Sequence, residues 1–207
     1  LLRKQPELVA DLAGRTHVIL AHHPVLDRNG KVVTTSVTNF DIHDIARSAA
    51  TYGLAGYHPV SPVRLQRDKI ERIIGIWRKE ITQAGAHNRG EALGTIRVSE
   101  SVEEALAHIE TRAKAKPWVV ATSAKTSELA PTVGFTQLFA ERAAAPGRPL
   151  VLILGTGWGL DDSVISLSDQ ILEPVYGPGE FNHLCVRSAL AIMLDRLFGR
   201  DSRARGD

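Results

Sequence analysis

One apolar run followed by a glycine-rich turn most constrains what this chain can fold into. Leu150–Leu154 contains only apolar residues, as expected of a strand that is buried on both faces of a parallel sheet. It runs directly into Gly155-Thr156-Gly157-Trp158-Gly159. Glycines at the end of a strand let the backbone turn sharply and approach a ligand closely. The pattern predicts an α/β fold with a ligand site at the carboxyl end of this strand.

A second strand and a second glycine-rich loop follow soon after. Gln170–Leu172 is the expected strand, and the loop Glu173–Glu180 precedes a helix that should begin near Asn182 or His183. Two loops at the ends of parallel strands, beside a helix N-terminus, form the usual ligand crevice of an open α/β sheet. The glycine spacing is neither G-x-G-x-x-G nor a P-loop, which argues against a dinucleotide or nucleoside triphosphate fingerprint.

Strands and helices alternate along the rest of the chain. Further strands are expected at 17–21, 56–60, 96–98 and 118–122, and further helices at 39–51, 62–84, 101–115, 136–144 and 161–167. Asn39 or Asp41 is the expected cap of the first of these helices, and residues 32–37 fit either the second strand of a hairpin or a polar loop. This alternation predicts a mostly parallel sheet with helices on both faces.

Length and composition point to a single domain. Of 207 residues 43% are hydrophobic, enough for one sizeable core. We expect a leader at 1–15, a domain at 16–199 and a disordered tail at 200–207. The formal charge of +2 permits binding to RNA without arguing for it. One cysteine excludes an internal disulfide framework, and no apolar run approaches the roughly 18 residues of a membrane helix, so we expect a cytoplasmic location without membrane contact.

Three segments together resemble the motifs of the SPOUT RNA methyltransferases. Leu154–Leu160 resembles the second motif of that superfamily, and Leu172–Gly177 followed by His183–Ala189 resembles the third. Asp41–Ala49, followed by Tyr52-Gly53, resembles the first motif of the ribose-methylating branch. The segments occur in the family's order and span most of the chain.

The resemblance implies an α/β fold with a deep C-terminal trefoil knot, whose loops hold S-adenosylmethionine (SAM) and release S-adenosylhomocysteine as product. It also implies an obligate homodimer with the acceptor site at the interface, and methylation of RNA as the function. Some similar bacterial proteins are fused behind a tRNA guanine-N1 methyltransferase. Leu1–Leu8 resembles the end of such an enzyme and lacks an initiating methionine. We therefore expect tRNA rather than rRNA as substrate, and a fused N-terminal tRNA methyltransferase domain as a candidate partner.

The same resemblance assigns the cofactor-binding residues. They are Leu154, Gly155, Thr156, Gly157, Leu172, Glu173, Pro174, Gly177, Asn182, Leu184 and Val186. Plain core packing is the alternative for Leu172 and Leu184, and helix capping is the alternative for Asn182.

Five residues are candidates for catalysis. Arg47 stands where the ribose-methylating relatives carry an arginine, so it is expected to hold an RNA phosphate or to help activate the acceptor oxygen; the alternative is an ordinary exposed helix arginine. Asp41 stands where those relatives carry asparagine and is a candidate general base, and Asn39 is the nearby amide. Glu180 and His183 are expected to face the substrate.

Other features of the sequence leave alternatives open. Cys185 and Arg187 depart from the family pattern, which leaves base and 2′-O-ribose methylation both open. We expect Cys185 to be a core residue rather than a nucleophile. His22 and His23 would point to opposite faces of a strand, so we expect no metal site. A non-catalytic RNA-binding or regulatory module is the second functional hypothesis, and a nucleotide-dependent oxidoreductase the third.

Overall fold

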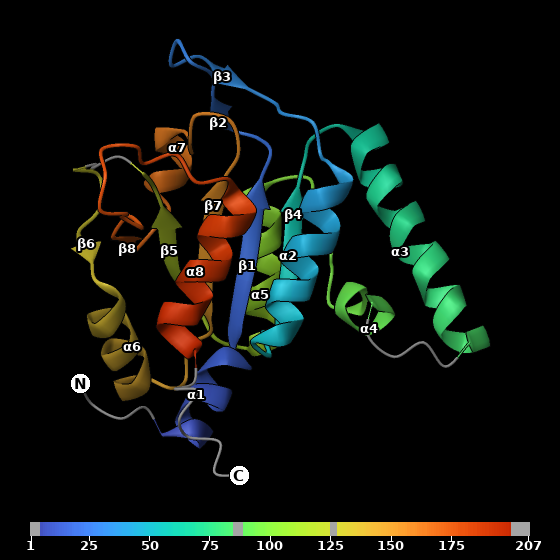
Figure 1. The fold of residues 1–207 in the computed structure, drawn as a ribbon, viewed down its shortest axis with the longest axis horizontal. Helices are drawn as coiled ribbons and strands as arrows, with labels where there is room; N and C mark the ends of the chain where they lie inside the picture. Colours follow the sequence, from blue (N-terminus) through green and yellow to red (C-terminus); the bar gives the residue numbers. More distant parts are fainter. Residues whose placement is uncertain (1–4, 85–88, 125–127, 200–207) are drawn as a thin grey trace.

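The computed structural model describes residues 5–84, 89–124 and 128–199, and its centre is a parallel sheet of six strands (Figure 1). The strand order is β4-β1-β7-β5-β8-β6, and every pairing is parallel. The strands are β1 (Thr16–Ala21), β4 (Gly56–Val60), β5 (Trp118–Thr122), β6 (Thr132–Val133), β7 (Leu150–Gly155) and β8 (Gln170–Leu172). The predicted mostly parallel α/β sheet is confirmed.

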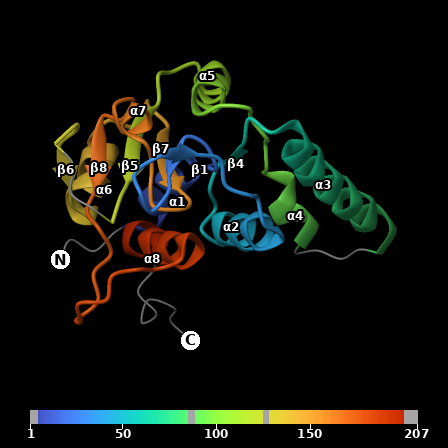
Figure 2. The same ribbon diagram turned by 90° about the horizontal axis from the view of Figure 1, so that it is seen from above.

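Helices cover both faces of this sheet (Figure 2). One face carries α1 (Pro6–Ala13), α2 (Asn39–Thr51), α6 (Phe135–Ala144) and α8 (Val186–Phe198), and the other carries α5 (Val102–Ala113) and α7 (Asp162–Ile165). Helices α3 (Arg64–Ala84) and α4 (Arg89–Gly94) lie beyond the β4 edge. A short antiparallel hairpin, β2 (Val25–Leu26) and β3 (Val32–Val33), projects past the carboxyl ends of the strands.

Burial on both faces explains why the strands read as continuous apolar runs. Every residue of β1 is buried. Val18 and Leu20 belong to the core beneath α2 and α8, whereas Ile19 and Ala21 belong to the core beneath α5 and α7. In β7, Leu150–Leu154 is buried throughout in the same way. Each fully buried Leu or Ile contributes about 2 kcal/mol of transfer free energy, so these two central strands supply much of the driving force for folding.

One predicted helix cap and one predicted helix start are wrong. Helix α2 is capped by Thr38, whose side chain accepts a hydrogen bond from the amide of Asp41, so Asn39 is its first residue rather than its cap. Helix α8 begins at Val186, with Cys185 as its cap, and not near Asn182 or His183. The long apolar periodicity of 186–198 drives helix formation, whereas the preceding residues lie in an extended loop.

Other differences concern short elements. Helix α4 and strand β6 were not predicted, since neither is long enough to show a period. The strand expected at 96–98 does not form, and only isolated bridges from Ile96 and Ser99 pair with Tyr57 and Val60 of β4. Residues 32–37 were expected to form either a hairpin strand or a polar loop, and they do both. Val32–Val33 pairs in the hairpin, and residues 34–37 are irregular.

Several expectations fall on residues outside the described ranges. These are the first four residues of the leader and the tail at 200–207. The described part of the leader forms α1, which ends at Gly14. Among the described residues, none of the helices combines the length and hydropathy needed to cross a membrane.

Three buried histidines make stability depend on pH. Burial lowers the pKa of His17 and of His22 to about 4, and that of His58 to about 3. In the unfolded chain each titrates near 6.5, so below that pH the unfolded state binds more protons and the folded state loses stability as pH falls. Between pH 7 and pH 5 we expect the free energy of unfolding to drop by about 2 kcal/mol for each of these histidines that titrates independently of the others.

Urea unfolding at several pH values would measure this effect. The His183→Gln variant, which removes an exposed histidine, should show the same dependence as the parent. A free energy of unfolding that stays level from pH 7 to pH 5 would contradict the prediction.

Candidate functional site

The loops that leave β1, β7 and β8 lie at the carboxyl edge of the sheet (Figure 1). We call Gly155–Leu160 the glycine loop, residues 22–38 the hairpin arm and residues 173–185 the C-terminal loop. The register pairs Ala21 of β1 with Gly155 of β7, so the hairpin arm and the glycine loop start side by side.

The glycine loop is shaped by contacts with the protein itself. Gly157 has φ +62°, and a Cβ there would lie 2.8 Å from the carbonyl oxygen of Leu26 in the hairpin arm. A Cβ on Gly155 would lie 2.8 Å from the amide nitrogen of Leu160. Larger residues at either position would force the backbone apart. These two glycines therefore permit close packing within the loop and against the arm.

Backbone hydrogen bonds join the hairpin arm to the glycine loop. The amide of Trp158 donates to the Leu26 carbonyl at 2.9 Å, and the amide of Leu26 donates to the Gly159 carbonyl at 2.9 Å. The amide of Thr156 donates to the Ala21 carbonyl at 3.2 Å. A cofactor bound to this loop must therefore use other backbone groups than the amides of Thr156 and Trp158.

A chain of polar side chains reinforces the junction. The hydroxyl of Thr156 donates to the Ala21 carbonyl at 3.2 Å and lies 2.5 Å from the hydroxyl of Thr35. Thr35 Oγ1 in turn lies 3.0 Å from His22 Nδ1. If the Thr35 hydroxyl donates to Thr156, His22 must donate through Nδ1, and a neutral imidazole fits because burial lowers the pKa of His22 to about 4. His22 Nε2 is buried and has no hydrogen-bond partner among the described residues.

Neither His22 nor Thr35 was expected at the site from the sequence. The signal that could have found them is the position of His22-His23 directly after a buried strand. At that edge of a parallel sheet, polar side chains gather around the ligand crevice.

The C-terminal loop forms few hydrogen bonds with the rest of the described chain. Glu173 is tied down, since its amide donates to the Val133 carbonyl at 2.9 Å and its carboxylate accepts from the amide of Phe135 at 3.1 Å, at the start of α6. Across 174–185, in contrast, no backbone amide donates to a backbone carbonyl of the described residues. The segment swings out from β8 and returns to the start of α8 (Figure 2). Its peptide groups are available to a ligand or to a second chain.

The N-termini of α2 and α8 are joined by charged side chains. Arg187 of α8 donates to the carboxylate of Asp44 at 3.2 Å and lies 4.0 Å from that of Asp41. The Arg187 guanidinium also stacks 5.1 Å from the ring of Phe40. Asp41 is buried, and its other oxygen accepts hydrogen bonds from the amide and the hydroxyl of Thr38, at 3.1 Å and 2.6 Å. This geometry makes Asp41 part of the capping box of α2 and engages both of its carboxylate oxygens within the protein.

The cofactor residues expected from the sequence lie in four places. Leu154 and Leu172 are buried in the core, which bears out the core-packing alternative for Leu172. Gly155, Thr156 and Gly157 form the glycine loop, and Glu173, Pro174, Gly177, Asn182 and Leu184 lie in the C-terminal loop. Val186 is the first residue of α8. Asn182 is not a helix cap, and Leu184 is exposed rather than in the core.

The remaining candidates lie mostly on the surface. Arg47 is exposed on α2, and Asn39 is exposed at the start of the same helix. Glu180 and His183 are exposed in the C-terminal loop, where the His183 ring packs 5.2 Å from that of Phe181. Cys185 is exposed, which corrects the expectation that it is a core residue. Among the described residues, no three His, Cys, Asp or Glu side chains are placed to hold a metal ion together.

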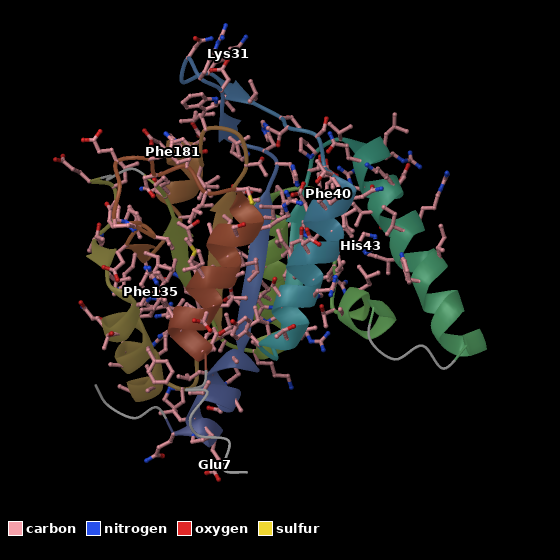
Figure 3. All side chains as sticks on the ribbon, viewed as in Figure 1. Glu7, Lys31, Phe40, His43, Phe135 and Phe181 are labelled. Atoms are coloured by element: carbon pink, nitrogen blue, oxygen red, sulfur yellow. The ribbon has the colours of Figure 1, made fainter. Side chains whose placement is uncertain are left out.

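Four aromatic side chains are exposed around these loops. Phe40, Trp158, Tyr176 and Phe181 have exposed fractions from 55% to 82%. Phe40 and Phe181 both lie toward the end of the molecule that carries the hairpin arm (Figure 3). Exposed aromatic groups gathered at one end of a molecule mark a surface that contacts a partner or a ligand.

Comparison with known proteins agrees with this layout. A family model described as SAM-dependent RNA methyltransferase matches residues 15–199. An uncharacterized protein of Aquifex aeolicus is 38% identical over 184 residues, which make up 89% of this chain and 88% of that protein. A tRNA (guanine-N(1)-)-methyltransferase of Oleidesulfovibrio alaskensis is 37% identical over 180 residues. That match takes in 87% of this chain, but the chain spans only 41% of that relative's length.

Solved structures share the fold. A probable methyltransferase from Bordetella pertussis Tohama I is similar with a TM-score of 0.61 and 17% identity, over 91% of this chain and 96% of that one. The SpoU methyltransferase AviRb from Streptomyces viridochromogenes, in complex with AdoMet, is similar with a TM-score of 0.50 and 17% identity, over 88% of this chain and 58% of that one.

Replacing Gly157 tests the packing between the hairpin arm and the glycine loop. In Gly157→Ala the new Cβ meets the Leu26 carbonyl and the residue must keep a positive φ, so we expect a loss of about 1–3 kcal/mol in the free energy of unfolding. Gly147→Ala is the control, because a Cβ there meets nothing within 4 Å. Urea unfolding of both variants measures the difference, and equal stabilities would show that the arm does not constrain the loop.

Proposed function

Since the chain belongs to the family of SAM-dependent RNA methyltransferases, we propose that it methylates tRNA at a site between the glycine loop, the C-terminal loop and the first turn of α8. Membership of this family confirms the resemblance to the SPOUT enzymes found in the sequence. The cofactor is SAM. The choice of tRNA, the location of the site and the roles of single residues are our proposal.

The observation that carries this placement is that, among the described residues, no backbone amide of 174–185 donates to a backbone carbonyl. A segment without internal backbone hydrogen bonds offers amide donors and carbonyl acceptors to a ligand. An adenine and a ribose can be recognised by such groups. Gly177 and Gly179 leave open space where side chains would otherwise stand, so a flat ring can approach the backbone there. The residues present therefore fit the cofactor.

Bound SAM supplies a methyl group on a sulfonium, whose sulfur leaves as a neutral thioether. The protein has to hold the acceptor in line with that methyl group and to receive the proton that the acceptor loses. Arg47, exposed on α2, is our candidate for holding an RNA phosphate near the acceptor. Glu180 and His183, exposed in the C-terminal loop, are our candidates for taking the proton.

We assign Asp41 a supporting role in this scheme. Its carboxylate caps α2 and faces Arg187, so it fixes the helix that carries Arg47 rather than touching the acceptor. Asn39, two residues before Asp41, is exposed and is our candidate for an amide contact to the RNA.

Two lines of support favour tRNA. A relative 37% identical to this chain is named a tRNA (guanine-N(1)-)-methyltransferase, although its greater length means that its name need not describe the part matched here. The leader also resembles the end of such an enzyme, so a fused tRNA methyltransferase domain is part of the proposal. A cytoplasmic location follows from an RNA substrate.

We also propose that the chain acts as a homodimer with a trefoil knot, as the SPOUT resemblance implies. The exposed aromatic residues beside the site support the dimer. A partner copy would cover them and would bring its own Arg47 toward the cofactor loops. The knot would involve the C-terminal loop and α8.

Calorimetric titration with SAM and S-adenosylhomocysteine tests the cofactor site. We expect micromolar binding by the parent and no detectable binding by Gly155→Arg, because even a Cβ at that position lies 2.8 Å from the Leu160 backbone. Gly147→Arg, in open space on the surface, should bind like the parent. Transfer of labelled methyl groups to bulk tRNA and rRNA from cells lacking the gene then identifies the substrate. Cofactor binding without labelled tRNA would reject tRNA as the acceptor.

Sedimentation equilibrium tests the dimer. We expect the parent to be dimeric and Phe181→Glu to weaken association at least tenfold, because a charge would replace an aromatic ring that is 82% exposed in the single chain. Leu65→Glu, an equally exposed apolar residue on α3, is the matched control and should remain dimeric. A monomeric parent would remove the dimer from the proposal.

A further inference from the structure

The hairpin arm is the element at the site whose purpose the cofactor and the dimer do not explain. It projects beyond the carboxyl edge of the sheet, with Lys31 at its far end (Figure 3). Only two pairs of residues form its ladder, Val25 with Val33 and Leu26 with Val32. A hairpin this short is not stable alone, so its position depends on what holds its base.

The base of the arm is held from two sides. On one side, Leu26 exchanges backbone hydrogen bonds with Trp158 and Gly159 of the glycine loop. On the other, the side chain of Gln66 in α3 accepts from the Val37 amide at 2.8 Å and donates to the Thr35 carbonyl at 3.3 Å. Lys69 of α3 also donates to the Val37 carbonyl at 3.2 Å. The tip is therefore held in a defined position relative to the glycine loop.

The tip itself presents hydrogen-bond donors and positive charge. Arg28, Asn29 and Lys31 are exposed in the turn, and Thr34 and Ser36 are exposed on the segment that returns to the base of the arm. In the described part of the chain, neither Arg28 nor Lys31 makes an ion pair within 4.0 Å.

The one carboxylate of the tip is engaged within the turn. Asp27 accepts from the amides of Asn29 and Lys31, at 2.8 Å and 2.9 Å, and these bonds lower the pKa of Asp27. Gly30, with φ +78°, completes the turn. The outward side chains are thus cations, an amide and hydroxyls. These are the groups that contact phosphate and sugar oxygens of nucleic acids.

We propose that the hairpin arm is an RNA-docking element, with Arg28 and Lys31 contacting the phosphate backbone of the substrate. This inference rests on the proposed function and adds to it the surface that receives the RNA. Because the arm is hydrogen-bonded to the glycine loop, a phosphate held at the tip is placed at a set distance from the methyl donor. The arm therefore positions the RNA and takes no part in the chemistry.

The test compares Arg28→Gln/Lys31→Gln with a control that removes the same charge at the opposite end. Arg112→Gln/Lys116→Gln is suitable, because both residues are exposed and lie where α5 leads into the start of β5. The probe is bulk tRNA from cells lacking the gene, with binding followed by fluorescence anisotropy from 50 to 300 mM salt. Loss of two phosphate contacts should reduce the slope of log affinity against log salt by about 1–2.

We expect the arm variant to bind tRNA about tenfold more weakly at 0.1 M salt and to show a KM for tRNA raised by about the same factor, with kcat changed less than twofold. Its affinity for SAM should equal that of the parent. The control should match the parent in all these measurements.

Two results would overturn the proposal. One is an arm variant whose salt slope and tRNA affinity equal those of the control. The other is an arm variant that sediments as a monomer while the control is a dimer, since the arm would then contact a second copy of the chain. Failure of the proposed function looks different, because the parent itself would then fail to bind SAM or to methylate tRNA.

Discussion

The parallel register between β1 and β7 is the constraint on which the rest of this structure depends. It pairs Ala21 with Gly155, so two chain segments separated by more than a hundred residues leave the sheet at the same level. The contacts between the hairpin arm and the glycine loop depend on this shared level. The hairpin arm can bond to the glycine loop only because both strands end together, and Thr156 can reach the Ala21 carbonyl only for the same reason.

Electrostatic contacts set a second junction, between α2 and α8. Arg187 lies between two carboxylates of α2, one buried and one half-exposed, and its guanidinium lies 5.1 Å from the ring of Phe40. The helix with the proposed RNA-binding arginine is thereby tied to the segment that follows the C-terminal loop. Such a partly exposed ion pair contributes about 1 kcal/mol at most, so its value lies in orientation more than in stability.

Much of the fold was predictable from the sequence, because long buried strands and amphipathic helices carry strong periodic signals. The apolar run Leu150–Leu154 predicted a strand buried on both faces, and the glycines that follow it predicted the loop. The start of α8 was not predictable in the same way, since the residues before Val186 offer several plausible caps and tertiary contacts decide among them. Strand β6 and helix α4 were too short to show a period.

The candidate site was predictable in outline but not in its contacts. Both loops follow the strands after which the sequence placed them, yet no spacing rule links Leu26 to Trp158 or Thr35 to Thr156, because these pairs meet only once the sheet has formed. Asp41 shows the same limit. The resemblance made this carboxylate a candidate base, and the structure adds that it caps α2 and faces Arg187, two contacts that no motif predicts. Which of two roles a polar residue takes depends on neighbours that the sequence does not place.

The C-terminal loop has a thermodynamic consequence. With no backbone hydrogen bonds of its own across 174–185, it opens at little enthalpic cost, and fixing each residue in one conformation costs about 1–2 kcal/mol of entropy. The first ligand to order the loop therefore loses this entropy from its own binding free energy. The next ligand then binds to a loop that is already ordered. A cofactor and a second protein chain that both touch the loop would therefore strengthen each other's binding without any change of fold. Their coupling would be carried by entropy rather than by a moving part.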